Sequence, residues 1–300
     1  AGAERIFSLI DEEPEKDDGY VTLVNVIEEN GEMVECPQRT GIWAWKHPHK
    51  ADNTVTYTRL QGAVTFHDVD FGYDENKIVL HNIKLYAAPG QKIAFVGSTG
   101  AGKTTIINLI GRYYIPQKGT ILIDDVPLER WQLKALRSGI SVVLQDVFLF
   151  VGSIADNISI HSELNEEQIR QALEVSCASE FVEECGGLKG EVTEAGMNFS
   201  TGQRQLLSFA RAIARDPAIL VLDEATAHID TDTEQIIQDS IAKISKDRTS
   251  IFIAHRLSTI QSCDCIFVLE KGRIIEQGNH EALMRKNGKY ADLVRSGQKD

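Results

Sequence analysis

The spacing of hydrophobic positions changes twice along the chain. Residues 1–19 combine a short amphipathic pattern with an acidic run, and residues 20–61 mix scattered apolar and aromatic positions with polar ones. Residues 62–300 alternate short apolar runs with helical spacing. These shifts predict a helix with a linker, an accessory hairpin segment (20–61) and one large domain (62–300).

Within the large domain, continuous apolar runs bounded by polar residues are typical of parallel strands that are buried on both faces of a sheet. The runs predicted as strands are 64–71, 78–80, 92–96, 120–123, 140–144, 218–222, 250–254 and 266–269. Helical spacing is strongest at 105–110, 166–173, 206–213 and 232–243. The pattern predicts an α/β fold with a mainly helical part at about 146–215.

In the first segment, Ile6, Phe7, Leu9 and Ile10 predict the end of an amphipathic helix. The acidic linker 11–18 follows directly, which is not the pattern of a secretory signal peptide. No apolar run of the chain approaches the roughly 18–20 residues that span a bilayer.

The accessory segment contains Trp43, Trp45 and the triplet His47-Pro48-His49. Two histidines around a proline can hold a metal, but no third ligand stands nearby, so a surface hairpin or loop is favoured. We expect the two tryptophans to be exposed aromatics of a polar hairpin that pack on the large domain or on a partner subunit. The segment is predicted to lie outside the site chemistry.

Charge and cysteine content narrow the function classes. The chain has 31 Lys+Arg against 44 Asp+Glu, a formal charge of −13, which argues against a nucleic-acid-binding surface. Its five cysteines are scattered and odd in number, as expected of ordinary thiols in a reducing cytosol.

One motif of the large domain carries specific chemistry. It matches G-x-x-x-x-G-K-[ST] between the apolar run 92–96 and the helical segment that starts at Thr105. In such a loop successive backbone N–H groups turn toward a polyphosphate, the lysine reaches the outer phosphates and the final hydroxyl can bind Mg²⁺. The sequence therefore predicts binding of a nucleoside triphosphate by Gly97, Ser98, Thr99, Gly100, Ala101, Gly102, Lys103 and Thr104.

A second motif ends the apolar run 219–222 with two carboxylates, Asp223 and Glu224. Asp223 is placed to hold Mg²⁺, directly or through water. Glu224 is placed to polarise a water for attack on the γ-phosphate.

Six further motifs stand along the chain in the order in which one protein family carries them. They are Phe71-Gly72-Tyr73, Gln145, Thr193-Glu194-Ala195-Gly196, Phe199-Ser200-Thr201-Gly202-Gln203-Arg204-Gln205, Ala227-His228-Ile229-Asp230, and His255. With these, residues 62–298 resemble the nucleotide-binding domain of an ATP-binding cassette (ABC) transporter. The resemblance implies a P-loop NTPase (RecA-like) core with a mainly parallel sheet, an antiparallel β subdomain and an α-helical subdomain. The run 193–196 resembles a loop of exporters.

The resemblance also implies the roles of individual residues. Glu224 and His255 would be catalytic, and Thr104, Gln145 and Asp223 would hold Mg²⁺. Tyr73 would stack on adenine, and ATP would be bound by the loop 97–104 with Thr105 and Gln145. In a closed dimer, Ser200, Gly202 and Gln203 would serve the nucleotide of the partner subunit.

Two departures from the family pattern stand out. Thr201 replaces the first glycine of the signature 199–205, and Ala227 replaces a common serine, with His228 after it. Glu224 and His255 are nevertheless present. Among exporters this combination resembles the catalytically complete half of an asymmetric pair, so a heterodimer is favoured over a homodimer.

The leading hypothesis is therefore the ATPase of a membrane exporter, partnered by transmembrane domains and a second nucleotide-binding domain at the cytoplasmic face of the membrane. Residues 1–19 then correspond to the tail of a last membrane-spanning helix and its linker, and the chain as given is expected to be soluble. The alternative is a non-transport ABC ATPase acting on DNA or ribosomes. That class needs coiled-coil insertions, a second cassette or basic arms, which this acidic sequence lacks. A phosphate-loop kinase or GTPase would lack the signature and the switch histidine.

Overall fold

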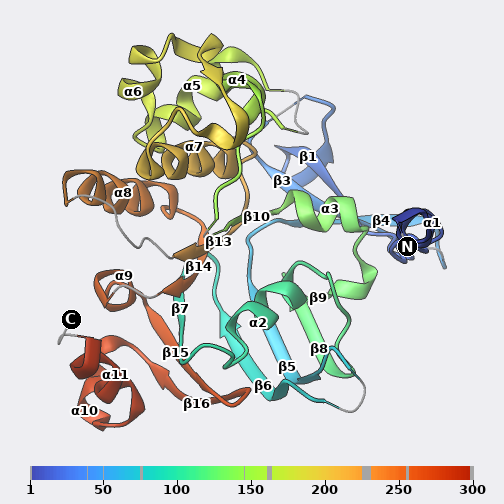
Figure 1. The fold of residues 1–300 in the computed structure, drawn as a ribbon. Coiled ribbons are helices and arrows are strands. Elements are labelled where there is room, and N and C mark those ends of the chain that lie inside the picture. The colour runs from blue at the N-terminus through green and yellow to red at the C-terminus, as the bar shows by residue number, and fades with distance from the viewer. Residues whose placement is uncertain are drawn as a thin grey trace.

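The computed structural model describes residues 2–38, 40–49, 51–74, 77–144, 146–160, 164–224, 231–254 and 257–297. At its centre lies a six-stranded sheet in the order β10-β13-β14-β7-β15-β16 (Figure 1). Neighbours from β10 to β15 are parallel, and β16 is antiparallel to β15. The strands are β7 (Lys92–Val96), β10 (Ile140–Val143), β13 (Ile219–Glu224), β14 (Thr249–Ala254), β15 (Cys265–Glu270) and β16 (Arg273–Gly278). The predicted mainly parallel sheet is confirmed.

The central sheet is buried on both faces. In β13, Leu220 and Leu222 belong to one hydrophobic cluster, while Ile219 and Val221 belong to a second. Since successive strand residues point to opposite faces, each cluster covers one face. This is why the strand is apolar at every position from 219 to 222.

A second, antiparallel sheet in the order β6-β5-β8-β9 confirms the predicted antiparallel β subdomain. Its strands are β5 (Val64–Phe71), β6 (Leu80–Ala87), β8 (Lys118–Ile123) and β9 (Val126–Pro127). The predicted strand at 78–80 is wrong except for Leu80. Val79 donates its N–H to the carbonyl of Phe71 at 2.7 Å and so closes the turn that leads into β6.

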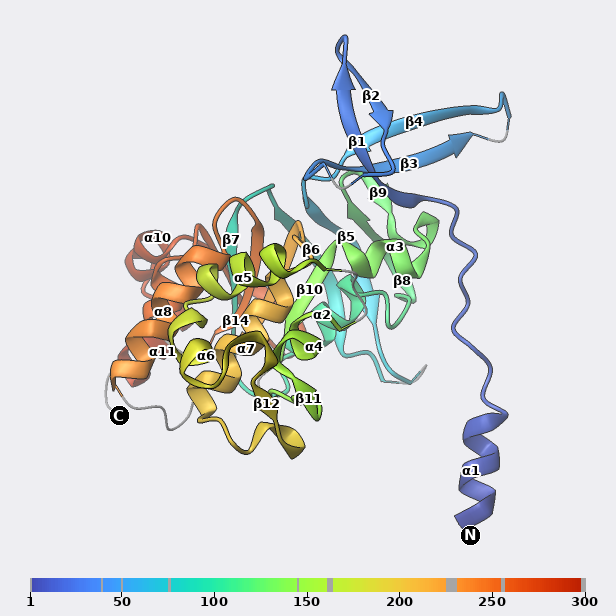
Figure 2. The same cartoon turned by 90° about the horizontal axis from the view of Figure 1, so that it is seen from above.

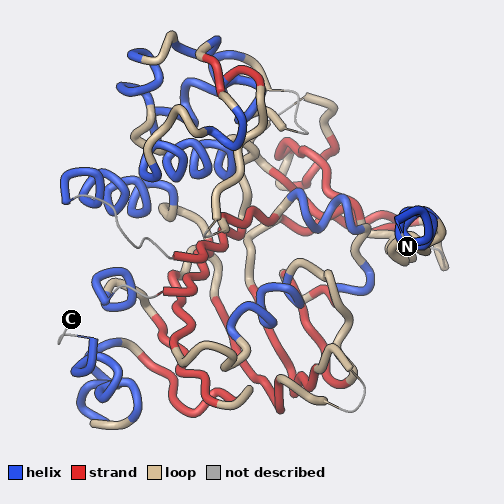
Figure 3. The backbone as a smooth tube through the Cα atoms, in the orientation of Figure 1, coloured by secondary structure: helices blue, strands red, loops and turns tan. Residues whose placement is uncertain are grey.

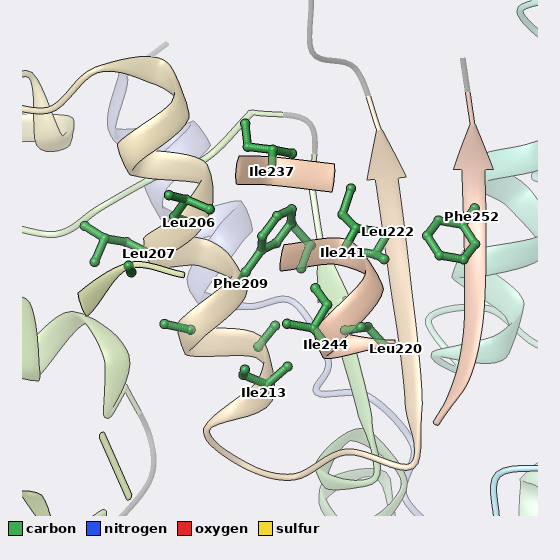
Figure 4. Packing of buried hydrophobic residues seen from close by; sticks show 14 of the residues in the cluster. Leu206, Leu207, Phe209, Ile213, Leu220, Leu222, Ile237, Ile241, Ile244 and Phe252 are labelled. Atoms are coloured by element: carbon green, nitrogen blue, oxygen red, sulfur yellow. The ribbon is translucent and has the colours of Figure 1, made fainter. Parts of the chain in front are cut away.

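The helical part occupies one side of the molecule, at the top of Figures 1 and 3. It contains α4 (Ile154–Ile158), α5 (Glu166–Val175), α6 (Ser179–Glu184) and α7 (Thr201–Ile213), with the short pair β11 (Gly152–Ser153) and β12 (Glu191–Val192). Figure 4 shows how the helical part packs on the central sheet: Phe209 of α7 lies next to Ile241 of α8 (Thr231–Ile244) and Leu222 of β13.

The remaining helices are α1 (Gly2–Ile10), α2 (Lys103–Ile110), α3 (Leu133–Ser138), α9 (Leu257–Gln261), α10 (His280–Lys286) and α11 (Lys289–Gly297), with single 3-10 turns at η1 (Leu128–Arg130), η2 (Gly187–Lys189) and η3 (Glu194–Gly196). Among the helices of the described ranges, none combines the length and the apolar content that crossing a bilayer requires.

The accessory segment forms a separate antiparallel sheet in the order β2-β1-β3-β4. Its strands are β1 (Thr22–Glu29), β2 (Glu32–Glu35), β3 (Trp43–His49) and β4 (Thr54–Arg59), and its two hairpins project from the body (Figure 2). His47 and His49 lie in β3, within the second hairpin.

Trp45 joins this sheet to the large domain. The expectation of an exposed aromatic is wrong for Trp45, which is 1% exposed and whose ring centroid lies 3.8 Å from that of Trp131. Its indole Nε1 donates to Asp124 Oδ2 at 2.8 Å. The carboxylate of Asp124 also accepts the backbone N–H groups of Gln61 (3.0 Å) and Ala63 (2.8 Å). The packing of Trp45 on the large domain is thereby confirmed.

Residues 11–19, called the strap below, form an extended segment that connects the exposed helix α1 to the body (Figure 2) and contacts the large domain through Glu15 and Asp17. Glu15 accepts two 2.7 Å hydrogen bonds from the guanidinium of Arg137, which hold the pKa of Glu15 below its usual value. Arg137 also donates to the carbonyls of Gly111 (3.2 Å) and Arg112 (3.3 Å), directly after α2. Asp17 accepts the N–H of Leu133 at 3.0 Å, where α3 begins.

Candidate functional site

The loop 97–102 connects the end of β7 to the start of α2, which is the predicted strand–loop–helix context. Glycine is required at both of its ends. A Cβ on Gly97 would lie 2.2 Å from the carbonyl oxygen of Leu269, and Gly102 has φ 107° with Leu80 Cδ2 2.6 Å from a Cβ position. The backbone can therefore turn sharply here and aim its N–H groups along the helix axis, as anion binding requires.

Lys103 is the first residue of α2 and is 8% exposed. Its Nζ donates to the carbonyls of Gly97 (2.6 Å) and Ser98 (3.1 Å). Burial lowers the pKa of Lys103, and the negative charge of Asp223 opposes that shift. An ammonium has three N–H donors, so one remains for a phosphate oxygen beside the two that hold the loop.

Tyr73 stands over the first turns of α2. Its hydroxyl donates to Thr105 Oγ1 at 3.2 Å and accepts from Asn108 Nδ2 at 3.2 Å. The ring meets Tyr114 edge-on at 5.0 Å between centroids, and Tyr73 stays 48% exposed. It is thus held in place while keeping surface for stacking on a base.

Asn108 and Tyr114 were not predicted as part of this arrangement. The repeated aromatic Tyr113-Tyr114, directly after α2, is the signal in the sequence that could have identified it.

Asp223 and Glu224 end β13, at the same edge of the sheet where β7 ends and the phosphate loop begins. Ligands of open α/β sheets bind at the carboxyl ends of the strands. Only β14 separates β13 from β7 in the sheet, so Asp223 lies at the same edge as the loop, and its negative charge opposes the fall in the pKa of Lys103. Thr104 is exposed at the start of α2. Carboxylate and hydroxyl oxygens are hard ligands that fit Mg²⁺.

Several predicted residues lie outside the described structure. These are Gln145, Ala227, His228, His255 and the side chain of Glu224. Their predicted roles stay predictions.

The signature 199–205 begins α7. Ser200 is the N-cap: its Oγ accepts the N–H of Gln203 at 3.2 Å, and Gln203 Oε1 accepts the N–H of Ser200 at 2.9 Å. Gly202 is buried, and a Cβ there would lie 2.1 Å from Thr233 Cγ2 of α8. Close packing of α7 on α8 thus requires this glycine, a reason that the sequence did not indicate.

Thr201 is exposed, within the first turn of α7, and its Oγ1 accepts from Arg204 at 3.3 Å. Figure 1 separates α7 widely from α2, so the structure brings Tyr73, the phosphate loop and Asp223 together and leaves the signature apart. A helix N-terminus with free N–H groups favours anions. Within one chain this helix start lies away from the phosphate loop (Figure 1).

The predicted exporter loop, 193–196, forms the 3-10 turn η3 just before the signature. Asn198 organises it: its Oδ1 accepts both the N–H (3.1 Å) and the hydroxyl (3.0 Å) of Thr193, and its Nδ2 donates to Glu191.

Comparison with known proteins agrees with this geometry. A family model described as ABC transporter matches residues 80–227. An uncharacterized ABC transporter ATP-binding protein of Bacillus subtilis is 47% identical over 246 residues, which is 81% of this chain and 41% of that protein. An ATP-dependent lipid A-core flippase of Pseudoalteromonas atlantica is 44% identical over 239 residues, 78% of this chain and 41% of the flippase.

Among solved structures, a bacterial Atm1-family ABC exporter with ATP bound matches with a TM-score of 0.73 and 38% identity, over 79% of this chain and 42% of the exporter chain. The chain thus spans about two-fifths of the length of the relatives it matches.

Proposed function

Because this chain belongs to the ABC transporter family, we propose that it binds and hydrolyses ATP with Mg²⁺ and so powers export across a membrane. The observation that carries the proposal is the shared edge of the central sheet. There the phosphate loop follows β7, and Asp223 and Glu224 end β13, with only β14 between the two strands.

The residues divide the work of phosphoryl transfer. Tyr73 stacks on the base, and the loop N–H groups with Lys103 neutralise the phosphates. Thr104, Gln145 and Asp223 would hold Mg²⁺, which would supply positive charge to offset the charge that develops on the phosphate. This assignment needs mainly positioning and charge, which the rigid loop and strand ends supply.

Glu224 and His255 complete the reaction. Glu224 accepts a proton from the water whose oxygen bonds to the γ-phosphorus, while the bond from that phosphorus to the β–γ bridging oxygen breaks and ADP leaves with its electron pair. His255 contacts the γ-phosphate. Ser200, Gly202 and Gln203 of a second subunit close the site from the other side.

Glu224→Gln tests this assignment. Gln keeps the shape but cannot take the proton, so we expect ATP affinity near the wild-type value, turnover lowered by about 10²–10⁴-fold, and a trapped ATP-bound dimer. Calorimetry, phosphate release and gel filtration measure these three. Glu180→Gln, an exposed change in α6, is the matched control. Wild-type turnover in Glu224→Gln would refute the assignment.

An exposed apolar surface supports a membrane-domain partner. Leu144, Phe148, Phe150 and Val151 are 61%, 56%, 54% and 71% exposed, and the rings of Phe148 and Phe150 lie 5.0 Å apart between centroids. Clustered exposed apolar side chains mark interaction surfaces. The transmembrane domains of the exporter dock here, and the chain works at the cytoplasmic face. The transport names of the relatives disfavour the non-transport alternative.

We further propose that the second nucleotide-binding domain is a different chain. Thr201 places a methyl and a hydroxyl at the exposed N-terminus of α7, where a partner's phosphate must approach backbone N–H groups. This chain would therefore support the partner's site poorly while its own carboxylate acts. Thr201→Gly should raise ATP turnover of the isolated chain and leave that of the heterodimer nearly unchanged. Equal turnover of the isolated wild type and Thr201→Gly would contradict the asymmetry.

A further inference from the structure

A large groove lies at the edge of the central sheet opposite the phosphate loop. Its volume is about 880 Å³, and its walls include Pro217 and Ala218 just before β13, Arg248 just before β14 and Gly90 just before β7. The ATP-site residues follow the ends of these strands, whereas the groove lies where the strands begin. The groove therefore does not belong to the nucleotide site.

The accessory sheet supplies one wall of the groove and the large domain supplies the other. Ile42, Trp43 and Leu60 come from the accessory segment, and Val175 of α5 and Ile213 of α7 also line the groove. These side chains make part of the lining apolar. Binding sites for small molecules are commonly clefts of about 300–1,000 Å³ between two structural units, with apolar walls and a few polar groups.

Charge at the groove is opposite to that of the whole chain. Four cationic side chains and two carboxylates line it, in a chain of formal charge −13. The cations are Arg59, Lys243, Lys246 and Arg248, and the carboxylates are Asp216 and Asp247.

The cations differ in how many hydrogen bonds and ion pairs their side chains already make within the protein, as three of the four show. Arg248 is engaged by Asp216 at 2.7 Å and by the carbonyls of Pro217 and Ile244. Arg59 meets Glu28 only at 3.6 Å, with both side chains more than half exposed. The side chain of Lys246 makes no ion pair with any of the residues that the structure describes. Arg59 and Lys246 thus remain available to an anion.

Trp43 adds its indole ring to this wall. Its indole Nε1 is buried and has no acceptor in the part of the chain that the structure describes. Buried polar groups in proteins nearly always have a partner, and each exception calls for an explanation. The indole N–H is enclosed within the protein, so the contribution of Trp43 to the groove is the face of its ring.

We propose that the groove binds a small organic anion with a flat apolar body. The body lies against Trp43 and Leu60, and its acidic group meets Arg59 and Lys246. The anion is distinct from ATP, and its site is built jointly by the accessory sheet and the large domain. This gives the accessory segment a role that ATP chemistry does not assign to it.

The test uses the full 300-residue chain and a matched pair of probes. 8-Anilinonaphthalene-1-sulfonate carries an aromatic body and a sulfonate, and N-phenyl-1-naphthylamine has the same body without the charge. Binding is followed by calorimetry and by the indole N–H signals in ¹⁵N-edited NMR spectra, where Trp43→Phe assigns the Trp43 signal. All titrations are repeated with saturating ADP and Mg²⁺.

We expect the sulfonate to bind, to move the Trp43 indole signal, and to be unaffected by ADP. Arg59→Gln with Lys246→Gln should weaken it about tenfold or more, since two charge-assisted contacts are lost. The control Lys84→Gln with Arg295→Gln changes the net charge equally at distant surface positions and should leave binding unchanged.

Three results would each overturn the proposal. One is binding of the sulfonate with an unmoved Trp43 signal, which would place the probe elsewhere, for example on Phe148 and Phe150. Another is competition by ADP, which would place it in the nucleotide site. The third is binding that does not depend on the charge contacts, shown either by equal affinity of the uncharged probe or by equal weakening in both double variants.

Discussion

Removing the carboxylate of Asp124 should loosen the accessory sheet by a predictable amount. The side chain is 8% exposed and accepts from three donors: Trp45 Nε1, the N–H of Gln61 and the N–H of Ala63. Asp124→Ala leaves all three without an acceptor, the Trp45 indole in a buried position and the two backbone N–H groups partly buried. At about 1–3 kcal/mol for each unsatisfied donor, reduced by partial relaxation, the free energy of unfolding should fall by roughly 3–5 kcal/mol.

Asp124→Asn is a milder change at the same position, and its loss of stability can be compared with that of Asp124→Ala. Oδ2 accepts two of the hydrogen bonds and Oδ1 accepts one, so the amide can keep the first two and must turn its NH₂ toward the N–H of Ala63. The expected loss is about 1–2 kcal/mol.

Urea unfolding monitored by the fluorescence of the contacting pair Trp45 and Trp131 measures both losses. The exposed neighbour Asp125→Asn is the control, because it removes the same charge without orphaning these donors. ATP affinity should be unchanged in all three variants. The reasoning fails if Asp124→Ala and Asp125→Asn unfold at the same urea concentration, or if Asp124→Asn is the less stable of the two Asp124 variants.

Two further predictions concern the nucleotide site and the signature. The pKa of Lys103 lies below its ordinary 10.5, because burial outweighs the charge of Asp223, so at alkaline pH the folded chain loses this proton before an ordinary lysine does. ATP affinity should then fall as pH rises toward 10.5, with proton uptake on binding, as measured by calorimetry in buffers of different ionisation enthalpy; binding without proton uptake would contradict it. Gly202→Ala should lower stability by about 1–3 kcal/mol through overlap with Thr233, and Thr233→Ser, which removes the overlapping methyl, should restore most of it in thermal unfolding. An equal loss in the double variant would assign the cost to something other than this contact.

Local pattern was sufficient to predict the phosphate loop and most strands of the central sheet. The loop is contiguous in sequence, and burial on both faces makes a strand such as β13 apolar throughout. β16 was missed because it lies at the sheet edge, where its side chains alternate between partly buried and exposed and make no continuous apolar run.

What could not be predicted depends on partners distant in sequence. Trp45 is buried by Trp131 and Asp124, and its hydrogen bond to Asp124 spans 79 positions. Gly202 is required by a methyl group of α8, not by the local turn. No spacing rule within a single segment contains such information.

The strap connects helix α2, which follows the phosphate loop, to any pulling force that acts on residues 11–19. Arg137 ties the strap to the carbonyls just after α2, while the opposite end of α2 is the phosphate loop. A helix of 8 residues is a stiff rod of about 12 Å. Tension applied along residues 11–19 would therefore act on one end of that helix and be transmitted to the other, where Lys103 binds the carbonyls of Gly97 and Ser98. The acidic linker would thus transmit force to α2, and the hydrogen bonds between Glu15 and Arg137 are the contact through which that force would pass.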